Sequence, residues 1–245
     1  MAAVRQCGVP IDERVPRQAT QEELEWLHTP AYVASILALD GETRSLDPDT
    51  AISAGSVVAA RLAAGAAIEL VDSLLDPLRS SRGMAMGRPP GHHAEADRAM
   101  GFCLFGNIAL AAVHAIDVRE LARVMIIDWD VHHGNGTQHL LESRGDIMVV
   151  NLHQAGIFPD TGALTETGIG VGEGATVNIP MPEGCGGLEY TAAFQEIVVP
   201  LAERFRPNLV LVSAGFDGHA WDPLAGQELQ TEDFRLMCHL ACEIA

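Results

Sequence analysis

The fold is decided by Ile126-Ile127-Asp128-Trp129-Asp130-Val131-His132-His133-Gly134-Asn135-Gly136-Thr137, where an apolar strand passes directly into acidic residues, histidines and glycines. Residues 124–127 are apolar and rich in β-branched side chains, as expected for a buried strand. Alternate residues of a strand share a face, so Asp128, Asp130 and His132 start out pointing the same way. Ligands collect at the carboxyl ends of strands in open parallel sheets, so this segment predicts a functional site.

The spacing of these polar residues indicates a metal site. A carboxylate and an imidazole two residues apart, Asp130 and His132, are natural ligands for one divalent ion. Asp217 follows a second apolar strand and a short glycine-containing turn, so it is the candidate third ligand. Two carboxylates and one imidazole leave a coordination position open to water, which is typical of a catalytic site. The alternative is a strand end with solvated side chains, although five Asp, His or Asn residues among eight exceed what a turn requires.

A second polar segment, Arg88-Pro89-Pro90-Gly91-His92-His93-Ala94, places two adjacent histidines after a backbone constrained by proline and glycine. Histidine exchanges protons near neutral pH, so His92 and His93 are candidates for proton transfer. Asp128 and Asn135 are their candidate partners, and the histidine paired with Asp would be the more basic of the two. A purely structural role for the two histidines is the alternative.

Composition restricts the class of protein. The chain has 245 residues, 48% of them apolar, which suffices for a large core. It contains no apolar run of transmembrane length and no signal-peptide pattern, so we expect a cytoplasmic protein without a membrane partner. The net charge of −18 argues against direct binding of nucleic acid and suits a cationic partner or substrate. The five cysteines form no CxxC pair and are interpreted as incidental thiols.

Short apolar strands alternate with helical segments, which predicts an α/β fold with a parallel sheet. Strands are expected at residues 84–86, 124–128, 147–151, 175–179 and 209–212. Helices are expected at residues 32–39, 50–75, 105–117, 137–142 and 187–205. A capping box at Thr20 is expected to open a further helix that runs to about residue 28, and Thr231 is expected to cap the last helix. Asp47 is the expected cap of the helix at 50–75, and Pro200 is expected to kink the helix at 187–205. No repeat or linker divides the chain, so residues 1–245 are expected to form a single domain. The last helix lacks a closing signal and no strand opens the chain, so this domain is expected to be truncated at both ends.

Four motifs together resemble the zinc-dependent histone deacetylase family, which includes bacterial acetylpolyamine amidohydrolases and acetoin-utilisation proteins. They are Arg88-Pro89-Pro90-Gly91-His92-His93-Ala94, Gly101-Phe102-Cys103-Leu104-Phe105-Gly106-Asn107, Asp128 through Thr137, and Ser213-Ala214-Gly215-Phe216-Asp217. Trp129 and Asn135 look more like the class II branch than class I. The resemblance extends from about Ala19 to the C-terminus and implies the three-layer arginase/deacetylase fold around a central parallel sheet.

The resemblance also implies the site and the reaction. One Zn²⁺ would be held by Asp130, His132 and Asp217. His92 and His93, backed by Asp128 and Asn135, would handle the protons of the attacking water and of the leaving amine. The reaction would be hydrolysis of an amide, releasing acetate and a free amine from acetyl-lysine of a protein or from an acetylpolyamine.

The resemblance further implies a substrate tunnel and a second cation. Phe102 and Phe158 would form the tunnel walls, and the carbonyl of Gly101 would face the substrate amide. A structural K⁺ would be bound by the side chain of Asp128, by the backbone carbonyls of Asp130, His132 and Leu152, and by Asn151. Homo-oligomerisation is left open.

One part of the family pattern is absent, namely the glycine-rich loop carrying a tyrosine that hydrogen-bonds the substrate carbonyl. Neither Tyr32 nor Tyr190 occupies this motif. Loss of one oxyanion donor typically lowers a rate by about 10²–10³-fold. An alternative hypothesis is therefore a catalytically impaired homologue or fragment that binds metal and an acylated amine without efficient turnover. A third is a ureohydrolase, which shares the fold but requires a two-metal cluster with additional Asp ligands.

Overall fold

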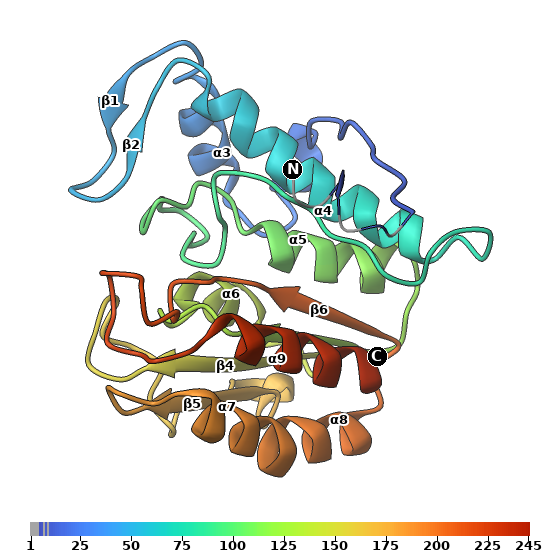
Figure 1. Cartoon of the computed structure of the whole chain (residues 1–245). Helices are drawn as coiled ribbons and strands as arrows, with labels where there is room; N and C mark the ends of the chain where they lie inside the picture. Colours follow the sequence, from blue (N-terminus) through green and yellow to red (C-terminus); the bar gives the residue numbers. More distant parts are fainter. Residues whose placement is uncertain (1–4, 7, 9) are drawn as a thin grey trace.

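Four parallel strands form the central sheet of the computed structural model, which describes residues 5, 6, 8 and 10–245 (Figure 1). The strand order is β5-β4-β3-β6, with bounds Thr176–Met181, Ile147–Gln154, Val124–Asp128 and Leu209–Ser213. Every residue of β3 and β4 is buried, as expected when helices cover both faces of a parallel sheet. The predicted α/β fold with a parallel sheet is confirmed.

The strands extend slightly beyond their predicted bounds. β4 continues to Gln154, three residues past the predicted end, and β5 includes Pro180. Proline is tolerated there because β5 lies at the edge of the described sheet, where one row of N–H groups needs no partner. The strand predicted at residues 84–86 is wrong, since Met84 and Met86 are exposed and lie outside any strand.

One face of the sheet packs against α5 (Asn107–Val113), its π-helical extension η1 (His114–Val118) and α6 (Asn135–Leu141). The shared core contains Val124 and Ile126 of the sheet and the alanines of α5. Alanine allows the helix to approach the strands closely. A further layer, made of α2 (Gln21–Leu24), α3 (Pro30–Leu37) and α4 (Ser56–Leu74), packs on the outer side of α5.

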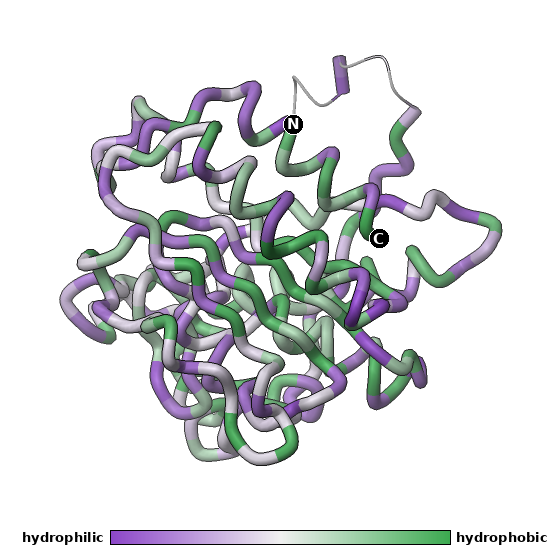
Figure 2. The backbone as a smooth tube through the Cα atoms, turned by 90° about the horizontal axis from the view of Figure 1, so that it is seen from below, coloured by the Kyte–Doolittle hydropathy of each residue, from purple (hydrophilic) through white to green (hydrophobic). Residues whose placement is uncertain are grey.

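The opposite face is covered by α7 (Gly187–Ala193), η3 (Phe194–Val198), α8 (Val199–Phe205) and α9 (Thr231–Glu243). The π-helical turn η3 directly precedes α8, whose second residue is Pro200, so the regular α-helix is interrupted next to this proline. Proline supplies no N–H and its ring clashes with the preceding turn. Figure 2 shows hydrophilic and hydrophobic segments alternating along the tube, in keeping with helices that bury one side. No helix in the described ranges is long and apolar enough to cross a membrane.

The helix boundaries confirm one predicted capping signal and contradict another. The capping box at Thr20 is confirmed, because its hydroxyl accepts from the Glu23 N–H while the Glu23 carboxylate accepts from the Thr20 N–H. Asp47 caps no helix. Its carboxylate accepts from the N–H of Thr50 at 2.6 Å and closes a turn between the two-residue strands β1 (Arg44–Ser45) and β2 (Ala51–Ile52). The helix predicted to begin at residue 50 therefore begins at Ser56.

Four further helix starts differ by one or two residues from the prediction, and one of them is α3, which begins at Pro30 rather than at residue 32. The helix predicted from residue 105 begins at Asn107, and α6 begins at Asn135 rather than 137. Thr231 is the first residue of α9 rather than its cap, because Gln230 occupies the capping position and donates its backbone N–H to Asp233.

Candidate active site

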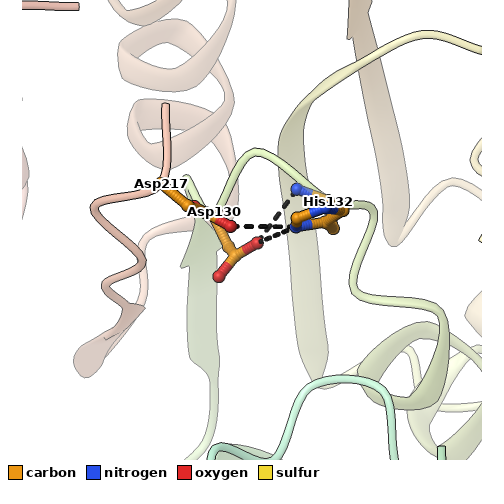
Figure 3. A group of neighbouring side chains, drawn as sticks. All are labelled: Asp130, His132 and Asp217. Atoms are coloured by element: carbon orange, nitrogen blue, oxygen red, sulfur yellow. Dashed lines mark hydrogen bonds and ion pairs between the residues drawn. The ribbon is translucent and has the colours of Figure 1, made fainter. Parts of the chain in front are cut away.

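Two neighbouring strands bring the three predicted metal ligands together. Asp130 and His132 lie in the loop that follows β3, and Asp217 lies in the loop that follows β6. Since β3 and β6 are parallel and adjacent, their carboxyl ends lie side by side. His132 Nδ1 is 2.8 Å from Asp217 Oδ2 and 3.2 Å from Asp130 Oδ1 (Figure 3). One ligand atom from each residue lies within 4.8 Å of the others, so one cation can contact all three.

The backbone of these loops fixes the cluster. The His132 N–H donates to Asp130 Oδ1, and the Val131 N–H donates to Asp217 Oδ1, which ties the two loops to each other. Gly215 allows the loops to approach, because a Cβ atom there would lie 2.3 Å from Asp130 Oδ2. A larger residue at position 215 would push the Asp130 carboxylate out of the cluster.

The charges of the cluster favour a bound cation. Burial lowers the pKa of His132, but hydrogen bonds to Asp130 and Asp217 outweigh this and raise it to about 9. Burial and the neighbouring Asp130 carboxylate raise the pKa of Asp217. Without a metal, the proton on His132 therefore neutralises part of the negative charge. A divalent ion would take over this role, and two carboxylates with one imidazole are a donor set that Zn²⁺ accepts. The residues present thus fit a zinc ion.

The two adjacent histidines have different partners. His92 Nδ1 is 3.1 Å from Asp128 Oδ2, and His93 Nδ1 is 2.7 Å from Asn135 Oδ1. Both side chains are buried, and their ring centroids are 3.9 Å apart. The arrangement matches the partners that the sequence suggested.

These partners give the two histidines opposite charge states. Burial lowers the pKa of His92, yet the carboxylates of Asp130 and Asp128 outweigh this and raise it to about 9. Burial and the charge on His92 lower the pKa of His93 to about 3. Near neutral pH this pair therefore consists of one charged and one neutral imidazole, which suits an acid and a base.

One aromatic side chain, that of Phe158, lies beside the histidines of the polar cluster. The ring of Phe158 meets that of His93 edge to face, with centroids 5.0 Å apart, and lies 6.3 Å from that of His132. Phe102 is 56% exposed and follows Gly101, which adopts a φ of +54°. A Cβ atom on Gly101 would lie 2.3 Å from His93 Cδ2, so only glycine permits this contact. The Gly101 carbonyl accepts a hydrogen bond from the Cys103 thiol.

A second group of oxygens lies behind the histidines. Asp128 and Asn151 are paired across β3 and β4, and both side chains are buried. A Cβ atom on Gly134 would lie 2.6 Å from Asp128 Oδ2 and 3.0 Å from Asn151 Oδ1, so the two oxygens face a common point. Among the described residues, Asn151 Oδ1 has no hydrogen-bond donor. A buried acceptor without a donor is a suitable ligand for a monovalent cation.

Sequence reasoning missed two residues near this site. His139 of α6 and Glu95 are not among the residues that the sequence motifs select. The Glu95 carboxylate accepts from Asn135 Nδ2 at 2.5 Å and lies 2.9 Å from His139 Nδ1. An acidic residue two positions after the paired histidines was the available signal. His133, a further residue without a predicted role, is buried and bonded to Thr161 and Gln138.

Comparison with known proteins agrees with this geometry. The family model described as histone deacetylase domain matches residues 2–245. The chain is 48% identical over 189 residues to "Histone deacetylase 10, chloroplastic" of Oryza sativa subsp. japonica, covering 75% of this chain and 42% of the relative. It is 42% identical over 230 residues to the "Histone deacetylase-like amidohydrolase" of Pseudomonas aeruginosa, covering 93% of this chain and 60% of the relative. The chain thus spans about half the length of these relatives.

Comparison with a solved structure identifies the fold. The crystal structure of the HDA15 HD domain superposes with a TM-score of 0.92 at 35% identity, covering 100% of this chain and 70% of the other. The parallel sheet between helical layers is therefore the arginase/deacetylase fold that the sequence motifs implied. With a family match over nearly its whole length and a close structural neighbour, the chain belongs to the histone deacetylase family.

Proposed function

We propose that this protein is a metal-dependent amidohydrolase that removes an acetyl group from an acetylated amine. The observation that carries this proposal is the position of the open cluster Asp130, His132 and Asp217 beside one charged and one neutral histidine. Family membership supports a deacetylase, and the donor set supports Zn²⁺ as the ion. Bound in the cluster, Zn²⁺ would polarise the substrate carbonyl and acidify a water molecule.

The protein side chains supply the proton transfers of this hydrolysis. Neutral His93 donates from Nδ1 to Asn135 and keeps the lone pair of Nε2 free to accept a proton from the attacking water. Charged His92 is held by Asp128 and stabilises the negative charge that develops on the substrate oxygen. As the amide C–N bond breaks, the proton on His93 passes to the leaving nitrogen, which yields acetate and a free amine.

The surroundings favour an acetylated cationic amine as the substrate. Phe158 and Phe102 offer apolar walls for an alkyl chain, and the Gly101 carbonyl can accept from the substrate amide. The net charge of −18 attracts a cation, which suits acetyl-lysine in a protein or an acetylpolyamine. K⁺ is proposed at the common point of Asp128 and Asn151, with carbonyls of Asp130, His132 and Leu152 completing its ligands.

The test measures acetate release from a fluorogenic acetyl-lysine peptide and from an N-acetylpolyamine, with and without a metal chelator. We expect turnover of at least one substrate, abolished by the chelator and restored by Zn²⁺. His93→Ala serves as the inactive control, and Glu196→Gln, an exposed position on η3, serves as the active one. A folded, zinc-loaded protein that releases no acetate from either substrate would refute the proposal.

One observation favours a second candidate, a protein that binds acylated amines with little turnover. Tyr32 donates its hydroxyl to the Leu104 carbonyl, and Tyr190, a residue of α7, is fully buried in the core. Neither tyrosine can therefore donate to a substrate oxyanion. Calorimetry with an acetylated amine would show zinc-dependent binding in this case, while the acetate assay gives no release.

The third hypothesis, a ureohydrolase, is less favoured. Within the described residues, one cluster of three metal-ligating side chains is found, whereas a two-metal site needs additional carboxylates. A cytoplasmic location, the absence of direct nucleic-acid binding and the single-domain organisation stay predictions, and homo-oligomerisation stays open.

A further inference from the structure

The side chain of Glu95 lies directly behind the predicted proton carrier. Asn135 bridges the two, because its Oδ1 is 2.7 Å from His93 Nδ1 and its Nδ2 is 2.5 Å from Glu95 Oε1. On its other side, the two carboxylate oxygens of Glu95 lie 2.9 and 3.0 Å from His139 Nδ1. The Glu95 side chain is 14% exposed and that of His139 is 43% exposed. A chain of hydrogen bonds thus leads from His93 to the protein surface.

The donors and acceptors in this series of hydrogen bonds determine which way each group points. An amide has one accepting and one donating end, so Asn135 could face His93 with either. An ionised carboxylate can only accept, so Glu95 forces the Asn135 NH₂ group toward itself and the oxygen toward His93. Burial raises the pKa of Glu95, but hydrogen bonds from His139 and Asn135 outweigh this and hold it below its ordinary value. Glu95 is therefore ionised across the neutral range.

The orientation of the Asn135 amide in turn selects the tautomer of His93. When Asn135 Oδ1 faces His93, Nδ1 must carry the hydrogen and Nε2 keeps its lone pair. If the amide turned around, Nδ1 would accept, the hydrogen would move to Nε2, and the ring would lose its free basic nitrogen. We propose that Glu95, held in place by His139, is a positioning residue that fixes the Asn135 amide and thereby keeps Nε2 of His93 free.

This role rests on the proposed function, since a free Nε2 matters when His93 accepts the proton of the attacking water. The chain of contacts is no proton wire, because the amide of Asn135 does not take up and release protons near neutral pH. It acts by orientation alone. The placement of Glu95 is also secured independently of its carboxylate: its backbone carbonyl accepts from His28 Nδ1 at 2.9 Å, and its backbone N–H donates to Arg98. A substitution of the side chain therefore leaves the backbone position intact.

The first test uses Glu95→Gln, which has the same shape but can either accept from or donate to Asn135. We expect kcat to fall about tenfold or more, as is typical when the group orienting a functional histidine is lost, with KM changed less than twofold. Glu196→Gln, the same substitution at an exposed position on η3, should leave both constants unchanged. Equal kcat in the Glu95→Gln variant and the wild type would overturn the proposal.

The second test reads the tautomer directly by ¹⁵N NMR of histidine-labelled protein, with His93→Gln used for assignment. We expect His93 to carry its hydrogen on Nδ1 in the wild type and to populate the Nε2–H form in Glu95→Gln. A wild-type ring protonated on Nε2, or one whose tautomer does not respond to Glu95→Gln, would overturn the proposal. This readout needs no turnover, so it decides the role of Glu95 even if the acetate assay refutes the proposed function.

A third test reverses the polarity of the contact and follows the melting temperature. Asn135→Asp places two carboxylates against each other, and Glu95→Gln in that background restores one donor and one acceptor. We expect Glu95→Gln to lower the melting temperature in the wild type and to raise it in the Asn135→Asp variant. A change of the same sign in both backgrounds would mean that the two side chains do not determine each other's orientation.

Discussion

Replacing Asp217 by Asn tests the metal cluster with a minimal change in shape. The Asn side-chain oxygen can still accept from the Val131 N–H, which Asp217 Oδ1 now does at 3.0 Å. The atom that replaces Oδ2, however, is an NH₂ group facing the cluster, and it carries neither a lone pair nor a negative charge. The variant therefore keeps the tie between the two loops and removes one of three ligands.

The size of the effect can be estimated from the number of ligands. Zn²⁺ binding to protein sites contributes on the order of 10 kcal/mol. Shared among three protein ligands, roughly 3 kcal/mol falls to each. A loss of that size raises the dissociation constant of Zn²⁺ by about 200-fold, since every 1.4 kcal/mol is about a factor of ten.

The assay is a competition titration of Zn²⁺ against a chromogenic chelator, together with metal content of the purified protein. We expect about one zinc per wild-type chain and a strong loss in Asp217→Asn. The control is Asp222→Asn in the same loop, whose side-chain oxygen accepts from the Leu224 N–H and can continue to do so. Unchanged zinc affinity in Asp217→Asn, with a folded protein, would show that Asp217 is no ligand and that the geometric reasoning fails.

Two further predictions concern the surroundings of the histidines. Gly101→Ala should lower both activity and melting temperature, because a Cβ atom would overlap His93 Cδ2 at 2.3 Å and the positive φ would be strained. The control is Gly156→Ala. Gly156 has a φ of +75° but open space around it, so this variant carries the backbone strain alone and should keep its activity. Equal effects of the two substitutions would show that the overlap is unimportant. The hydrogen bond to Glu95 raises the pKa of His139, so its stabilising contribution is full below the ordinary pKa of about 6.5 and is lost as the pH rises through the folded value. The difference in melting temperature between wild type and His139→Gln should accordingly shrink from pH about 6 to about 9, and a difference that grows with pH would contradict this sign.

Much of the architecture follows from local signals in the sequence. The apolar runs before Asp128 and before Ser213 predict strands because a buried parallel strand needs side chains that are apolar on both faces. The failures occur where a local signal served another purpose. Asp47 has the side chain of a helix cap, but it closes the turn of a small hairpin, and only the pairing of β1 with β2 reveals this.

In the candidate site, too, some features follow from local sequence signals and others only from tertiary contacts. The composition of the motifs identified which side chains carry chemistry, and the Asp and Asn partners indicated that His92 and His93 would differ in basicity. The sequence by itself thus determined the fold class, the family resemblance and the candidate ligands, since these depend on residue types and short spacings. The tertiary structure alone decided that Asp217, 85 residues from His132, lies within 2.8 Å of it, and that Glu95 and His139 stand behind Asn135. Such contacts depend on strand order and on the approach of separate loops, and neither is encoded in the neighbourhood of any one residue.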